Sequence, residues 1–150
     1  NLDPLLTPDD TSDDRAWGAY CIDKNTTVNP GTYNNVGLFS TLDIPGLPDY
    51  VEDQEIPWAH VNWLVNNFDE FTAISWKEIQ VAMWVIESNY TVAYPYTSLT
   101  IAGVDADKVK LMVEAADDKD DFVPMPGQYA AVIIHLNLNE YQAIFTIVDP

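Results

Sequence analysis

Apolar residues recur at two different spacings along this chain, and the change from one to the other limits the folds it can adopt. In the middle of the chain, three segments carry them at the three- and four-residue intervals of amphipathic helices. Residues 128–138 and 141–148 are instead β-branched and aromatic runs joined by Asn139-Glu140, a pattern typical of an antiparallel hairpin. We therefore expect an α+β fold with an antiparallel β-sheet or sandwich core, about three helices and a C-terminal β-hairpin.

The three helical segments have recognisable ends. A capping box formed by Ser75 and Glu78 opens an apolar run and predicts a helix over 75–87. Residues 58–68 form a second amphipathic stripe, and residues 105–116 form a third segment capped by its first residue, an aspartate. In the helix over 75–87, the side chains expected to face the core are Ile79, Ala82, Met83 and Ile86.

The remaining segments suggest one domain with an extended arm. Residues 1–15 combine proline with like-charged aspartates and are expected to be an acidic N-terminal arm, while residues 16–150 form a single domain. Residues 17–22 are typical of a buried strand, which places Cys21 near a strand end. Three prolines in residues 40–57 exclude a long regular element there.

Net charge narrows the classes of partner. The chain has 24 acidic residues against six Lys and Arg, a formal charge of −18, so nucleic acids and anionic membrane surfaces are poor partners. No apolar run approaches the roughly 18 to 20 residues that span a bilayer, so we expect no membrane insertion. The excess of acidic residues favours a secreted or cell-surface protein that stays soluble through its net charge. The chain opens at Asn1 without an initiator Met or a signal region, and we expect that it has been trimmed.

Two short motifs stand out because they pair a thiol with a carboxamide. Tyr20-Cys21-Ile22 lies on the predicted strand, and Gln80-Val81-Ala82-Met83-Trp84 lies on the capped helix. Together they resemble the motifs of the thioester domains of bacterial surface proteins, in which a Tyr-Cys-hydrophobic strand precedes a helix carrying Gln, Ala, an aliphatic residue and Trp. The resemblance covers roughly residues 17–148 in chain order. It departs from the family at Ile79, where many members have Thr.

The resemblance implies an internal thioester between the sulfur of Cys21 and the acyl carbon of Gln80. A lysine amine from a partner would attack that carbon, leaving an isopeptide-type amide on Gln80 and a free thiol on Cys21. The implied function is a binding or adhesion module rather than an enzyme. Its partners would be protein or small-molecule amines.

The chemistry also has a basis in the residues themselves. A thiolate is a strong nucleophile, and a carboxamide held against it in a water-poor site can lose ammonia to give a thioester. Trp76 and Trp84 lie one turn to either side of Gln80 and are expected to keep water away. The alternative is that Cys21 is a small buried apolar side chain and Gln80 an amphipathic-edge residue.

Other catalytic groups have weaker signals. His60 lies on the edge of a predicted helix and His135 inside a hydrophobic strand, where packing is the usual role. The sequence has no Cys or His pair with zinc spacing, no Gly-rich phosphate loop and no Gly-x-Ser-x-Gly elbow. A conventional hydrolase is therefore not expected.

Acidic clusters offer oxygen ligands for calcium, the one cofactor that the sequence suggests. None of the clusters matches an EF-hand loop, and the alternative is a solvated acidic face. Calcium also enters a second hypothesis, a structural subunit of an extracellular fibre or matrix. In that hypothesis the arm at 1–15 adds a strand to the sheet edge of another copy. The favoured cluster consists of Asp117, Asp118, Asp120 and Asp121, and the alternative is the group of Asp9, Asp10, Asp13 and Asp14 in the arm.

Overall fold

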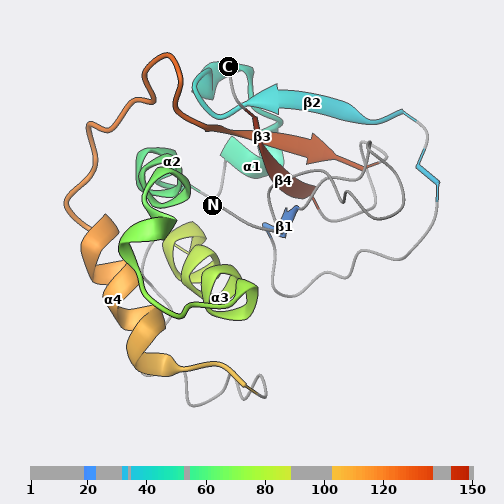
Figure 1. The fold of residues 1–150 in the computed structure, drawn as a ribbon. Helices are drawn as coiled ribbons and strands as arrows, with labels where there is room; N and C mark the ends of the chain where they lie inside the picture. The colour runs from blue at the N-terminus through green and yellow to red at the C-terminus, as the bar shows by residue number, and fades with distance from the viewer. Residues whose placement is uncertain are drawn as a thin grey trace.

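Helices pack beside an antiparallel sheet in the computed structural model of the chain (Figure 1). The residues that the structure describes are 19–22, 32–33, 35–52, 55–88, 103–136 and 143–148. The arm at 1–15 and the turn at Asn139-Glu140 lie outside these ranges. Within them, the predicted α+β class is confirmed.

The sheet has four strands in the order β1-β4-β3-β2, and all neighbours are antiparallel. The last two strands form the predicted C-terminal hairpin pairing, with Ile133 opposite Phe145. All described strands belong to this single sheet, so in the described part of the chain the core lies between sheet and helices rather than between two sheets. The strands are β1 (Tyr20–Cys21), β2 (Gly37–Ser40), β3 (Ala130–His135) and β4 (Ala143–Val148).

Three helices lie side by side on one side of the sheet (Figure 1), and their bounds agree with the prediction to within two residues. The Ser75 N–H donates to Glu78 Oε2 at 2.7 Å, which completes the predicted capping box. Asp105 Oδ1 accepts from the Asp107 N–H at 3.0 Å, as its capping role requires. These helices are α2 (Trp58–Asn66), α3 (Trp76–Glu87) and α4 (Ala106–Ala116).

Short helical turns occupy the loops, where no long element was expected. Between β2 and α2 the described residues form η1 (Ile44–Gly46) and α1 (Asp49–Glu52). A further turn, η2 (Phe68–Glu70), follows α2 directly, because the chain leaves the α-helix at Asn67. No helix in the described part of the chain is both long enough and apolar enough to cross a bilayer.

The core is built from the inner face of the sheet and the facing sides of the helices. Tyr20 stacks on Phe145 with ring centroids 5.4 Å apart, and Trp58 meets Phe145 edge-on at 6.3 Å. On α3 the predicted inward face is buried throughout, and Met83 is fully enclosed. Tyr20 anchors β1 in this core and thereby fixes the position of the next residue, Cys21.

Candidate functional site

The structure brings Cys21 and Gln80 together although 59 positions separate them in the sequence. Cys21 lies at the end of β1, an edge strand of the described sheet, and Gln80 lies in the second turn of α3. The Cys21 N–H donates to Gln80 Oε1 at 2.9 Å, and Gln80 Nε2 donates to the Cys21 carbonyl at 3.0 Å. Both polar atoms of the carboxamide are therefore held by the main chain of the residue that carries the thiol.

Trp84 completes the contacts to Cys21 from one turn further along α3. Its indole Nε1 donates to the Cys21 carbonyl at 3.0 Å, so this oxygen accepts two hydrogen bonds. Trp76 occupies the first position of α3 and is 52% exposed. Of the two tryptophans expected to shield Gln80, only Trp84 has a described contact with the Cys21 main chain.

The electrostatic surroundings favour the neutral thiol. Two causes raise the pKa of Cys21 above its ordinary value. Burial is the larger cause, and the negative charge of Glu87 is the second. A protonated thiol is a weak nucleophile, so an attack by Cys21 needs a group that takes its proton. Glu87, the last residue of α3, is itself 4% exposed.

The hydrogen bond from the Cys21 N–H has a chemical consequence. When a nucleophile attacks a carboxamide, negative charge develops on the carbonyl oxygen, and a donor fixed near 3 Å stabilises that charge. The Cys21 N–H is in this position relative to Gln80 Oε1. The thiol is attached to the same residue and is separated from this main chain by one rotatable bond. The arrangement suits an attack by Cys21 on the acyl carbon of Gln80.

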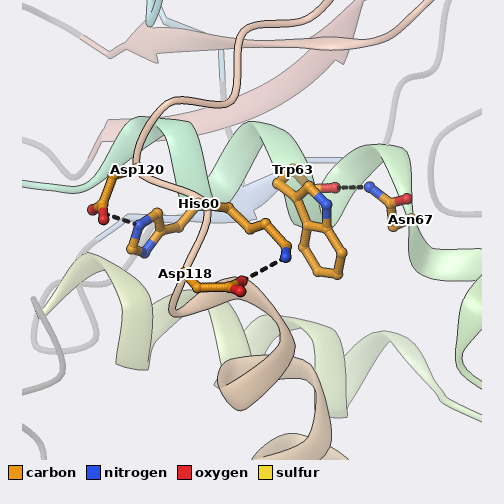
Figure 2. A network of polar contacts seen from close by, with 6 residues as sticks. His60, Trp63, Asn67, Asp118 and Asp120 are labelled. Carbon is orange, nitrogen blue, oxygen red and sulfur yellow. Dashed lines mark hydrogen bonds and ion pairs between the residues drawn. The ribbon is translucent and has the colours of Figure 1, made fainter.

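The two histidines are both buried. His60 on α2 is buried, and its Nε2 lies 3.0 Å from Asp120 Oδ1 in the loop after α4 (Figure 2). Both residues line a cavity of about 480 Å³, together with Trp58 and Asp121. His135 is buried in β3, and this burial lowers the pKa of its imidazole. The burial of His135 agrees with the packing role expected for it, whereas His60, expected at the edge of its helix, is also buried.

The acidic cluster after α4 has its carboxylates turned to different partners. Asp118 Oδ1 lies 2.5 Å from Lys119 Nζ, whereas Asp120 faces His60 (Figure 2). Among the residues that the structure describes, no three His, Cys, Asp or Glu side chains form a group that could hold a metal ion. The structure therefore does not gather the predicted calcium ligands, which are Asp117, Asp118, Asp120 and Asp121.

Sequence reasoning missed Glu87, although its spacing was informative. Gln80, Trp84 and Glu87 stand at i, i+4 and i+7, which places them on one face of a helix. A charged residue on that face, two turns from Gln80, could have been singled out from the sequence as a candidate neighbour of the predicted site.

No protein family, curated protein or solved structure matches this chain in the three comparisons. A functional interpretation therefore depends on the residues and geometry described above.

Proposed function

We propose that this protein is a binding or adhesion module in which Cys21 and Gln80 form an internal thioester that reacts with amines of a partner. The observation that carries the proposal is the double hydrogen bond between the Gln80 carboxamide and the Cys21 main chain. The resemblance of the two motifs to bacterial thioester domains supports it.

Thioester formation follows from the contacts in order. Cys21 Sγ attacks the Gln80 acyl carbon, and the charge that develops on Oε1 is stabilised by the Cys21 N–H. The Gln80 nitrogen leaves as ammonia once it has received the thiol proton, and the product is a Cys21–Gln80 thioester. Departure of Nε2 removes one donor from the Cys21 carbonyl, but the Trp84 indole continues to donate to it.

The thioester is consumed when a primary amine attacks the same carbon. The amine nitrogen takes the place of the departed ammonia and becomes an amide on Gln80, while Cys21 regains its thiol. Each chain reacts once, so the protein acts as a reagent and not as an enzyme. A formal charge of −18 favours partners with exposed lysines, because opposite charge accelerates their encounter. Such a role fits a secreted or cell-surface protein.

Amine trapping tests this function directly. Protein incubated with methylamine should gain about 31 Da on the thioester form, because the amine adds without a leaving group other than the thiolate. Peptide mapping should place the methylamide on Gln80, and Cys21 should become reactive to iodoacetamide at the same time. Cys21→Ser is the control and should incorporate no methylamine. Incorporation at another glutamine, or equal incorporation in Cys21→Ser, would contradict the proposal.

A second candidate function is supported by the opposite edge of the sheet. β2 is an edge strand of the described sheet, and its Leu38 is 68% exposed. An exposed edge strand with an apolar side chain can accept a further strand from another molecule. This arrangement favours a fibre subunit in which the arm at 1–15 pairs with β2 of a neighbour.

Truncation and a charge substitution test the fibre function. The full chain should form assemblies visible by electron microscopy, and a variant without residues 1–15 should remain monomeric by light scattering. Leu38→Lys should have the same effect, because lysine on an edge strand opposes strand addition. A full chain that stays monomeric at high concentration would contradict this second function.

A further inference from the structure

Glu87 is a buried ionisable group on the same helix face as the reactive carboxamide. It follows Trp84 by three positions and Gln80 by seven, and both of those side chains bond to Cys21. Its side chain lies among the buried residues of the chain, at 4% exposure. Burial of a carboxylate carries a substantial desolvation cost, and groups of this kind concentrate at functional sites.

Glu87 lies on the face of α3 from which Gln80 and Trp84 bond to Cys21, so the buried carboxyl group is on the side of the helix that meets the thiol-bearing strand. Burial of Cys21 is the larger cause that raises the pKa of its thiol, and the charge of Glu87 is the second cause. A buried carboxylate on this face is the kind of group that could receive the thiol proton when the sulfur attacks, because carboxylates serve as general bases. Glu87 therefore both favours the protonated thiol and could serve as the proton acceptor that the thiol needs.

We propose that Glu87 is the acid–base group of the Cys21–Gln80 pair, an inference that rests on the proposed function. In formation, the Glu87 carboxylate accepts the proton of the Cys21 thiol as the bond between Sγ and the Gln80 acyl carbon forms. The resulting carboxylic acid gives this proton to the Gln80 nitrogen as its bond to carbon breaks. Thiol and carboxamide become thioester and ammonia, and Glu87 returns to its carboxylate form.

The same group serves the reaction with a partner amine. As the amine nitrogen bonds to the acyl carbon, Glu87 accepts one of its protons. When the bond between carbon and sulfur breaks, Glu87 returns that proton to Cys21 Sγ. Thioester and primary amine become secondary amide and thiol, without an oxidant, a reductant or a further reactant.

Three substitutions on α3 test the inference. Glu87→Gln keeps the size of the side chain and removes its acid–base function, while Glu87→Asp keeps the carboxyl group and withdraws it by one methylene. Glu78→Gln is the matched control, because Glu78 is a second buried glutamate on α3 and glutamine also satisfies a capping box. The readouts are the rate at which refolded protein loses ammonia, by intact mass, and the rate of opening by methylamine.

We expect Glu87→Gln to slow both reactions by about a hundredfold, the usual order for loss of a positioned proton acceptor. Glu87→Asp should recover part of this loss and remain about tenfold below the wild type, since a misplaced group is less effective. Glu78→Gln should react at the wild-type rate. A merely structural role for Glu87 would predict no such recovery by aspartate, with the slow rate following the melting temperature instead.

The outcomes separate this inference from the function beneath it. A wild-type protein that never loses ammonia overturns the proposed function itself. A wild-type protein that forms the thioester, beside a Glu87→Gln variant that forms it equally fast, overturns the role of Glu87 alone. If Glu87→Gln does not fold, Glu87→Ser takes its place as the variant without a carboxyl group, and a wild-type rate in that variant overturns the inference.

Discussion

Gln80 shares its binding geometry with another carboxamide of the protein, and the comparison shows what is particular to it. Asn66 on α2 accepts from the Tyr129 N–H at 2.8 Å and donates to the Tyr129 carbonyl at 2.8 Å. A carboxamide is complementary to a peptide group, so such pairs fasten a helix to a neighbouring segment. At Gln80 the paired residue carries a thiol. The same docking contact there holds the carboxamide against the main chain of a cysteine.

At the scale of single residues, the influence of Glu87 on Cys21 can be measured without a thioester. In a Gln80→Ala background the thiol stays free, and adding Glu87→Gln should lower the pKa of Cys21, because one of the two causes that raise it is removed. The pH dependence of alkylation by iodoacetamide reports this pKa, since the thiolate is the reacting form. An unchanged or higher pKa would show that Glu87 does not act on the thiol.

At the scale of elements, the inward face of α3 should determine how strongly the helix is held. Met83 is fully buried, so Met83→Ala should lower the free energy of unfolding by about 2 to 5 kcal/mol, measured in urea. Leu111→Ala on α4 is the control, because Leu111 is 59% exposed and its truncation should cost about 0.5 kcal/mol or less. Equal losses in the two variants would mean that α3 is not packed as described.

The start of α3 should make stability depend on pH. Burial acts to raise the pKa of Glu78, but hydrogen bonds from Ser75 and the Asp105 N–H outweigh it, so the pKa is lowered from the ordinary value of 4.5. A lowered folded pKa stabilises the protein fully above pH 4.5, and this stabilisation is lost as pH falls through the folded value.

Glu78→Gln should therefore lose less stability than the wild type between pH 5 and pH 3, measured as urea unfolding at each pH. All other carboxyl groups are common to both proteins, so the difference between the two curves belongs to Glu78. Parallel curves, or a steeper loss in Glu78→Gln, would contradict the hydrogen bonding described at this helix start.

Helices were the elements best predicted from the sequence, because their signals are local. The caps at Ser75 and Asp105 and the apolar spacing each lie within one segment, and α2, α3 and α4 begin where they indicate. β2 was not predicted, since four residues of alternating exposure carry little pattern. The strand order depends on contacts between distant segments, which local periodicity does not encode.

The candidate site could be predicted only in part. The pairing of Cys21 with Gln80 was expected from two motifs, and the structure places the residues in contact. Trp84 lies against β1 and bonds to the Cys21 carbonyl, whereas Trp76 begins α3 and is largely exposed to solvent. Helical spacing treats the two tryptophans alike, so only the docking of α3 on the sheet could separate them.

At the scale of the whole molecule, the formal charge of −18 should make stability depend on ionic strength. Like charges repel in the folded state, so NaCl should raise the melting temperature as it screens them. The calcium prediction is tested in the same titration. Ca²⁺ that raises the melting temperature beyond NaCl of matched ionic strength, and more than Mg²⁺ does, would support a specific site. Equal melting curves in all three salts would mean that the acidic clusters are solvated surface without a specific calcium site.

The central claim, an internal bond between Cys21 and Gln80, is tested most directly by the intact mass of the purified, untreated protein. The account predicts a mass about 17 Da below that calculated from the sequence, because one ammonia is lost when the thioester forms. Cys21→Ser and Gln80→Ala should each have their full calculated mass. A wild-type protein at full mass, with a Cys21 thiol that is alkylated at once after unfolding, would contradict the claim.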